Sequence, residues 1–174
     1  IGATTRLGDL SEPLRERFGI QLRLELYSQD ELIQIALRTA SVLGVTLTHG
    51  GASVLASRAR GTPRILNSFI RRAMDVVHAS GHSDIDETVA LATLDMLEID
   101  ELGLDRMDRK MLDILVNDYN GNPVGINTLA VSIGEEAKTI QEVYEPYLIA
   151  SKLIQPTSRG RVATQRAINY MRRM

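Results

Sequence analysis

Two short arginine motifs have the side chains and the spacing to bind phosphate groups. In the first, Arg64 follows the run Gly-Thr-Pro at residues 61–63, where threonine can cap a helix and proline can occupy its first position. The amides at a helix N-terminus and a nearby guanidinium can then bind the same anion. In the second, Arg159 and Arg161 flank Gly160, so a tight turn would let two guanidinium groups lie on either side of a phosphate backbone. The alternatives are an exposed arginine at an ordinary helix start and a solvated surface turn.

A bundle of helices is predicted for residues 26–98. Ser28 and Glu31 have the spacing of a capping box, apolar residues follow at helical intervals, and Gly44 can end the helix. Further helix starts are predicted at Thr48, Thr62 and Asp86. The helix that starts at Thr62 would reach about residue 79 and would hold the first arginine motif in its first turn.

A second domain that ends in a β-hairpin is predicted after this bundle. The acidic stretch 98–105, interrupted by a glycine, is typical of a linker. It is followed by an amphipathic helix at 105–119, a short helix at 128–133 and a longer helix from Glu135 toward Leu148. Two short strands around a Ser-Arg-Gly-Arg turn come next, before a final basic helix. The order helix, helix, helix, hairpin is typical of a winged helix.

The first 25 residues are polar and rich in turns, and they cannot form a domain alone. A strand is predicted at 22–26, where Leu-Arg-Leu-Glu-Leu alternates. Because the chain begins with Ile1 and not with methionine, we expect Ile1 to be a fragment boundary. The sequence contains no G-x-x-x-x-G-K-[ST] loop, which would cradle and grip a triphosphate. We therefore expect that this chain alone does not hydrolyse ATP.

Composition argues against several kinds of site. Of the 174 residues, 44% are hydrophobic and none is cysteine, which excludes disulfides and thiolate zinc sites. The histidines lack metal-ligand spacing, so no metal site is predicted in this chain. No apolar run approaches the ~20 residues of a membrane span, and we expect a cytoplasmic protein without a membrane partner. The net charge of −2 is polarised. After residue 150 the charged residues are all basic: Lys152, Arg159, Arg161, Arg166, Arg172 and Arg173.

Several longer motifs occur in a single order along the chain. They are IGATTR, PLRERFGI, LELY, RGTPRI, LDRMDRKMLDIL, NPVGINTLA, EPYLI and SRGRVAT. Together they resemble the RuvB family, the AAA+ motors of bacterial Holliday-junction branch migration, over essentially the whole chain. The resemblance implies a mainly α fold in three parts. These are the C-terminal remnant of an α/β AAA+ ATPase domain at 1–25, a helical lid at 26–98, and a winged helix with a β-hairpin wing at 99–174.

The resemblance implies nucleotide-binding residues both before the lid and within it. Thr5 resembles the first sensor, whose hydroxyl lies near the γ-phosphate, although a threonine at a strand end can also satisfy local backbone groups. Arg64, preceded by Pro63, resembles the second sensor. Tyr27 resembles the tyrosine that packs against adenine, and its alternative is a half-buried core position.

The resemblance also implies a catalytic group that acts between subunits. Arg17 resembles the arginine finger, which reaches the nucleotide of the next subunit and neutralises charge in phosphoryl transfer. Arg15 is a nearby competitor, and a solvated surface arginine is the structural alternative. The implied cofactor is ATP or ADP with Mg²⁺, and the metal ligands are expected in the missing upstream half.

The implied DNA contacts lie in the wing, at Arg159, Gly160 and Arg161. The implied partners are the arms of a four-way DNA junction, RuvA, and further copies of the protein in a hexameric ring. The implied role is ATP-driven DNA translocation in recombination, DNA repair and the SOS response. Close groove contact by the third helix is less expected, because that helix carries glutamates at 135, 136, 142 and 145.

Two other classes of protein share part of this pattern. A winged-helix DNA-binding regulator without enzymatic activity would have no use for the G-A-T-T-R motif, and it should carry base-reading side chains on the third helix. That helix offers Lys138, Thr139 and Gln141 among glutamates. A clamp-loader-like AAA+ subunit would share the sensors but should have a helical collar in place of the winged helix. Weak sequence preference with steep salt dependence would favour the motor.

Overall fold

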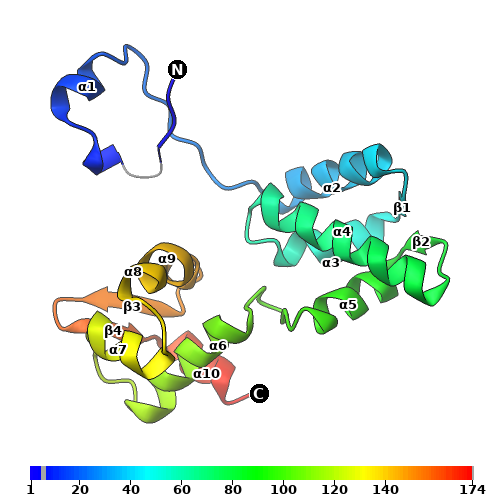
Figure 1. The fold of residues 1–174 in the computed structure, drawn as a ribbon. Helices are drawn as coiled ribbons and strands as arrows, with labels where there is room; N and C mark the ends of the chain where they lie inside the picture. Colours follow the sequence, from blue (N-terminus) through cyan, green and yellow to red (C-terminus); the bar gives the residue numbers. More distant parts are fainter. Residues whose placement is uncertain (5–6, 174) are drawn as a thin grey trace.

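Two hydrophobic cores organise the chain, one in each of two helical domains (Figure 1). The computed structural model describes residues 1–4 and 7–173. The first core joins helices that lie between residues 29 and 96, and the second joins the helices and the hairpin from residue 104 onward. The mainly α fold with a small β-hairpin that the sequence predicts is confirmed.

The first domain is a helical bundle with one very short sheet. Its helices are α2 Gln29–Leu43, α3 His49–Arg58, α4 Pro63–Ser80 and α5 Glu87–Met96. The strands β1 Thr46–Leu47 and β2 Asp84–Ile85 pair in parallel. The sequence does not predict this pair, because strands of two residues are too short to show a period. The largest fully buried side chains here are Leu32, Leu55, Leu66, Ile70, Ile85 and Leu94, and burial of each contributes roughly 1.5–3 kcal/mol.

Side-chain caps begin most helices of this bundle. Ser28 accepts from the backbone N–H of Glu31, whose carboxylate in turn accepts from the Ser28 backbone, and the predicted capping box is thus confirmed. Thr48 and Asp86 cap α3 and α5 as expected. Thr62 is an exception, because its hydroxyl makes no cap hydrogen bond to α4.

The second domain has the element order of a winged helix. Its helical elements are α6 Arg106–Asp113 continued by the π-helical segment η2 Ile114–Asp118, α7 Ile126–Ile133, α8 Ala137–Thr139, the π-helical segment η3 Ile140–Tyr144, α9 Glu145–Ala150 and α10 Gln165–Met171. The strands β3 Ile154–Thr157 and β4 Gly160–Ala163 form the predicted antiparallel hairpin, with Ile154 opposite Ala163 and Thr157 opposite Gly160.

The third helix of this domain contains a wide turn. The sequence predicts one helix from residue 135 toward 148, and the structure has a continuous helical run with η3 between α8 and α9. Pro146 is in the first turn of α9 and has no N–H to donate to a carbonyl one turn earlier. The N–H of Glu145 instead reaches the carbonyl of Ile140, five residues back, which is the hydrogen bond of a π-bulge.

The N-terminal segment packs into neither core. It contains the 3₁₀ turn η1 Leu7–Asp9 and the short helix α1 Glu12–Glu16, and none of its described residues before α2 is buried. The strand predicted at 22–26 does not form, and Leu22, Leu24 and Leu26 remain 84%, 91% and 66% exposed. Their alternation needs a neighbouring strand to become β-structure, and none of the described strands pairs with this segment. Among the described residues, no helix combines the length and the apolar character of a membrane span.

Candidate nucleotide and nucleic-acid interfaces

The start of α4 presents an arginine beside uncapped backbone amides. Pro63 is the first helical residue, and Arg64 follows it with an exposed side chain. The hydroxyl of Thr62 donates to the carbonyl oxygen of Arg60 at 3.2 Å and not to any group of the helix. No side chain caps the N–H groups of the first turn. These amides and the guanidinium can therefore act together on an anion.

Tyr27 lies against the turn that leads into α4. Its N–H donates to the carbonyl oxygen of Gly61 at 3.0 Å, and its residue surface is 48% exposed. Gly61 has a φ of +70°, and a Cβ there would come within 2.7 Å of the Cβ of Leu26. This close approach needs glycine. The structure thus brings Tyr27 to the same turn as Arg64, with its ring available to a ligand.

The structure places Arg17 away from this turn. Arg17 follows the last residue of α1 and is exposed, whereas Arg15 is half-buried. Figure 1 shows α1 separated from the bundle that carries α4. Arg17 and Arg64 are therefore not brought together within one chain. Thr5, the remaining predicted sensor, lies outside the described residues.

The tip of the hairpin presents Arg159 to solvent. Ser158 and Arg159 form the connection between β3 and β4, and the N–H of Arg159 donates to the hydroxyl of Thr157 at 3.3 Å. Gly160 has a φ of +138°, and a Cβ there would lie 2.2 Å from the carbonyl oxygen of Val124. Gly160 therefore allows the wing to lie directly against Val124, two residues before α7.

Of the two arginines predicted to lie on either side of a phosphate backbone at the wing, Arg161 makes an ion pair within the domain. Its Nε donates to Glu145 Oε1 and its Nη2 to Glu145 Oε2 at 3.2 Å. The side chains of Arg161 and Glu145 are only 16% and 10% exposed. An arginine paired in this way fixes the wing to α9, and Arg159 is left as the exposed arginine of the hairpin.

The acidity of the third helix is smaller at its surface than its sequence indicates. Glu145 is buried in the pair with Arg161, and Glu142 Oε1 lies 4.0 Å from Lys138 Nζ.

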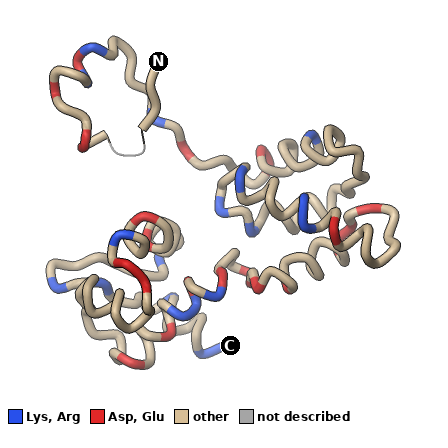
Figure 2. The backbone as a smooth tube through the Cα atoms, viewed as in Figure 1, with Lys and Arg blue, Asp and Glu red and all other residues tan. Residues whose placement is uncertain are grey.

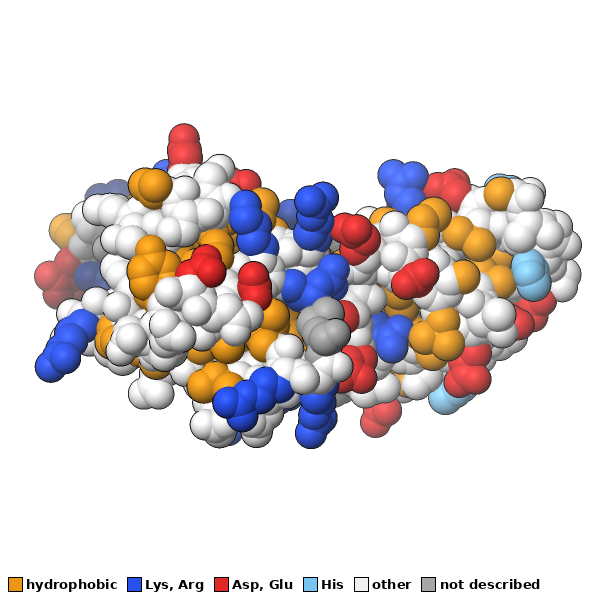
Figure 3. All heavy atoms as spheres, turned by 90° about the horizontal axis from the view of Figure 1, so that it is seen from below, with side chains coloured by type: hydrophobic (Ala, Val, Ile, Leu, Met, Phe, Trp, Pro, Cys, Tyr) orange, Lys and Arg blue, Asp and Glu red, His pale blue; other side chains and the backbone are white. Residues whose placement is uncertain are grey.

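Figure 2 shows acidic and basic segments in the second domain, and Figure 3 shows Lys and Arg side chains gathered in the middle of one face of the molecule. Exposed basic side chains at the C-terminal end are those of Lys152, Arg159, Arg166, Arg172 and Arg173.

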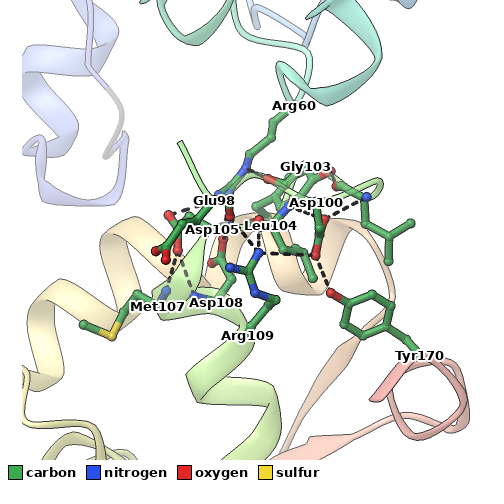
Figure 4. A network of polar contacts seen from close by, with 12 residues as sticks. Arg60, Glu98, Asp100, Gly103, Leu104, Asp105, Met107, Asp108, Arg109 and Tyr170 are labelled. Atoms are coloured by element: carbon green, nitrogen blue, oxygen red, sulfur yellow. Dashed lines mark hydrogen bonds and ion pairs between the residues drawn. The ribbon is translucent and has the colours of Figure 1, made fainter. Parts of the chain in front are cut away.

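A polar junction between the two domains is the feature that sequence reasoning missed. Arg60 extends from the turn before α4, where its Nε donates to the carbonyl oxygen of Gly103 at 2.7 Å and its Nη2 donates to Asp108 Oδ2 (Figure 4). Its guanidinium carbon lies 4.5 Å from the ring centre of Tyr147. These partners are more than 40 positions away, so no local spacing could indicate them.

The predicted linker is part of this junction and is held by hydrogen bonds. Asp100 Oδ1 accepts from the N–H groups of Leu102 and Leu104, both at 2.8 Å, and its other oxygen accepts from the Tyr170 hydroxyl of α10. Arg109 Nη1 donates to the carbonyl oxygen of Glu98 at 2.7 Å. The stretch 98–105 is therefore an ordered connection between the cores.

Burial changes the acidity of Asp108 in this junction. Loss of solvent raises the pKa of its carboxyl from 3.8 to about 6, against the opposing charge of Arg60. Its Oδ1 is buried and accepts no hydrogen bond from any described group. A raised pKa means that the folded state binds the proton more tightly than the unfolded state. The contribution of Asp108 to stability is thus complete below pH 3.8 and is lost as the pH rises through about 6.

We expect the substitution Asp108→Asn to remove this pH dependence, because the amide stays neutral throughout. Urea unfolding at a series of pH values should show a free energy that falls between pH 3.8 and about 6 in the parent chain and a flatter profile in the variant. Asp75→Asn on the exposed face of α4 is a matched control. Equal slopes for the parent and Asp108→Asn would contradict the raised pKa.

Known proteins resemble both domains of the chain. The family model described as "RuvB AAA lid domain" matches residues 27–100, and the one described as "RuvB C-terminal winged helix domain" matches residues 101–172. The Holliday junction branch migration complex subunit RuvB of Chlorobium chlorochromatii is 52% identical over 169 residues, which are 97% of this chain and 48% of that protein. The RuvB subunit of Rubrobacter xylanophilus is 48% identical over 171 residues, 98% of this chain and 48% of that protein. The chain spans about half the length of the curated relatives it matches.

Solved structures give the same result. The Thermotoga maritima RuvB Holliday junction branch migration motor matches with a TM-score of 0.88 and 42% sequence identity, over 94% of this chain and 55% of that one.

Within the part of the chain that the structure describes, no group of three or more His, Cys, Asp or Glu side chains could hold a metal ion.

Proposed function

Because residues 27–172 belong to the RuvB family, as its lid and its winged-helix domain, we propose that they form the nucleotide-sensing and DNA-binding part of an ATP-driven branch-migration motor. The observation that carries this proposal is the presence of both family domains, in order, with an uncapped helix start beside the exposed Arg64 in one and the exposed Arg159 of the hairpin in the other. The motor acts on Holliday junctions in recombination and DNA repair.

The nucleotide site is completed by groups outside the two domains. Arg64 and the amides of α4 bind the phosphates, Pro63 fixes the start of the helix, and Tyr27 packs against the base. Thr5 orients the attacking water near the γ-phosphate. The loop that cradles the triphosphate and the ligands of Mg²⁺ belong to parts of the full-length protein that precede this chain. In this proposal the chain alone does not hydrolyse ATP.

Arg17 acts on the nucleotide of a neighbouring subunit. Its exposure and the separation of α1 from α4 support this role, because an arginine that acts on a neighbouring subunit must be accessible to it. Such a group requires a ring of copies, for which the family arrangement is a hexamer, and RuvA is the partner that holds the junction. Hydrolysis then moves the lid, and the lid moves the winged helix along DNA.

The wing binds DNA through charge and not through base reading. Arg159 is the exposed arginine of the hairpin, and the C-terminal helix adds Arg166, Arg172 and Arg173. Contacts of this kind go to phosphate and carry no sequence information directly. A motor that moves along any junction arm needs this type of contact, whereas a sequence-specific regulator needs contacts to base edges.

We expect Arg159→Ala to weaken DNA binding to the same extent on unrelated sequences. Loss of one phosphate contact should reduce the slope of log K against log salt by about 1. The measurement is a salt titration of DNA affinity with the full-length protein, using Arg72→Ala on α4 as the control. An unchanged slope of log K against log salt would mean that Arg159 contacts no phosphate and that DNA binds at another surface.

A junction-migration assay tests the whole proposal. The full-length protein with RuvA should separate a synthetic four-way junction only when ATP and Mg²⁺ are present. A protein that binds one duplex sequence with nanomolar preference and migrates no junction would instead be a winged-helix regulator.

A further inference from the structure

One turn of the first domain contacts Tyr27 on one side and the second domain on the other. Residues 59–62 connect α3 to α4, and the carbonyl oxygen of Gly61 accepts from the N–H of Tyr27 at 3.0 Å. Two residues after this turn stands Arg64, the proposed phosphate ligand. The opposite side of the turn faces the second domain, where Arg60 makes its contacts (Figure 4). A change at the start of α4 is thus adjacent to the contacts that hold the winged helix.

Arg60 is the side chain of this turn that crosses to the second domain. Its side chain is 13% exposed, and its partners come from three elements of the second domain: the linker carbonyl of Gly103, Asp108 in α6 and Tyr147 in α9. A charge-assisted hydrogen bond is about twice as strong as a neutral one, and a cation–π contact becomes stronger when it is desolvated. No other residue of the turn has a side-chain hydrogen bond to the second domain among the contacts described.

The backbone around Arg60 holds the side chain in one direction. Arg60 has a φ of +55°, in the left-handed region that residues other than glycine rarely adopt. On the facing segment, a Cβ at Gly103 would lie 2.7 Å from the carbonyl oxygen of Arg58. The two backbones therefore touch at this point.

The contacts continue from Arg60 to the wing. Tyr147, under the guanidinium, is two positions along α9 from Glu145, and Glu145 holds Arg161 of β4. Arg161 in turn lies two residues from Arg159 at the hairpin tip. A cation–π contact, the short helix α9 and one ion pair thus join the turn beside the nucleotide-facing helix to the strand that follows the exposed arginine of the wing.

We propose that Arg60 is a positioning residue that couples the nucleotide state of the lid to the orientation of the winged helix. The inference rests on the proposed function and adds the element through which that function transmits motion. When ATP hydrolysis changes the phosphate bound at α4, this helix moves. Arg60 transmits the movement to α6 and α9, which move together. Without Arg60 the lid still senses nucleotide and the wing still binds DNA, but the two events no longer drive each other.

The test is the full-length protein with Arg60→Met, which keeps the length of the side chain and removes its charge. We expect the number of base pairs migrated per ATP hydrolysed to fall about fivefold or more, the lower end of typical coupling between sites. Stimulation of ATP hydrolysis by junction DNA should fall with it. Affinities for nucleotide and for DNA, measured separately, should stay at wild-type values, which a general loss of structure would not allow.

Controls separate coupling from loss of charge or of fold. Arg72→Met changes an arginine of α4 that is 59% exposed and pairs only with Asp75 at the surface, and it should leave the migration per ATP unchanged. Arg60→Met combined with Tyr147→Leu should be no worse than the more severe single variant, because both remove one contact. If Arg60→Met does not fold, the same measurement is made on Tyr147→Leu and Arg60→Lys. Each of these variants should also migrate fewer base pairs per ATP hydrolysed.

The outcomes distinguish the inference from the function on which it rests. A folded Arg60→Met protein that migrates as many base pairs per ATP as the wild type would overturn the coupling role alone. A wild-type protein that shows no ATP-driven migration would overturn the proposed function itself.

Discussion

Replacing Arg17 with alanine in the full-length protein lowers the rate of ATP hydrolysis by about 10³–10⁵-fold, if this arginine stabilises the charge of phosphoryl transfer as such groups do. ATP binding should persist, because the phosphate ligands proposed for the same subunit are Arg64 and the amides of α4. The physical reason for the size of the effect is that the positive charge acts on the transition state and much less on the bound nucleotide. Single-turnover hydrolysis and equilibrium nucleotide binding measure the two quantities separately.

Mixed rings provide a sharper form of this experiment. An Arg17→Ala subunit with an intact nucleotide site, mixed with a subunit that keeps Arg17 but cannot bind ATP, should restore part of the activity if the arginine acts between subunits. Arg15→Ala is the matched control in the same segment, since Arg15 is half-buried and Arg17 is exposed. Near wild-type turnover in Arg17→Ala with loss in Arg15→Ala would transfer the role to Arg15.

The substitution Arg161→Ala should destabilise the winged-helix domain by about 3–5 kcal/mol, because it leaves the charge of Glu145 buried and unpaired. The ion pair fixes β4 to α9, with both side chains largely buried. Urea unfolding of the second domain gives the change in free energy. In contrast, Arg159→Ala at the exposed tip should change stability by less than about 0.5 kcal/mol.

A second substitution separates the ion pair from DNA contact. Arg161→Met together with Glu145→Gln removes both charges, and this double variant should recover most of the stability lost by Arg161→Ala. An Arg161→Ala domain with unchanged stability and weakened DNA binding would contradict the structural role and return Arg161 to the DNA surface.

Local patterns in the sequence predict the elements of both domains well. The capping box at Ser28, the stop at Gly44 and the caps at Thr48 and Asp86 are local signals, and the structure has each of them. The hairpin is also local, because a turn and two short apolar strands lie within about ten residues. The Thr62 cap fails, since its hydroxyl bonds to the backbone of Arg60 within the preceding turn.

Contacts between distant residues account for what the sequence could not predict. Arg161 has the position of a turn residue, and only the packing of α9 against the wing shows that its partner is Glu145. Arg60 belongs to the same motif as Arg64, yet its role depends on residues 43 and 48 positions away. The wide turn at η3 has a local cause in Pro146. The apolar residues around it keep a helical period, so their pattern gives no sign of the turn.

The leucines at 22, 24 and 26 have a practical consequence for the solubility of the chain. They lie in a segment that pairs with none of the described strands, and an unpaired segment with exposed apolar side chains is a template to which a second chain can add a strand. Arg23 and Glu25 alternate with the leucines, so the run has no net charge to oppose that addition. The colloidal behaviour of the chain at high concentration is thus governed by residues that contribute to neither core.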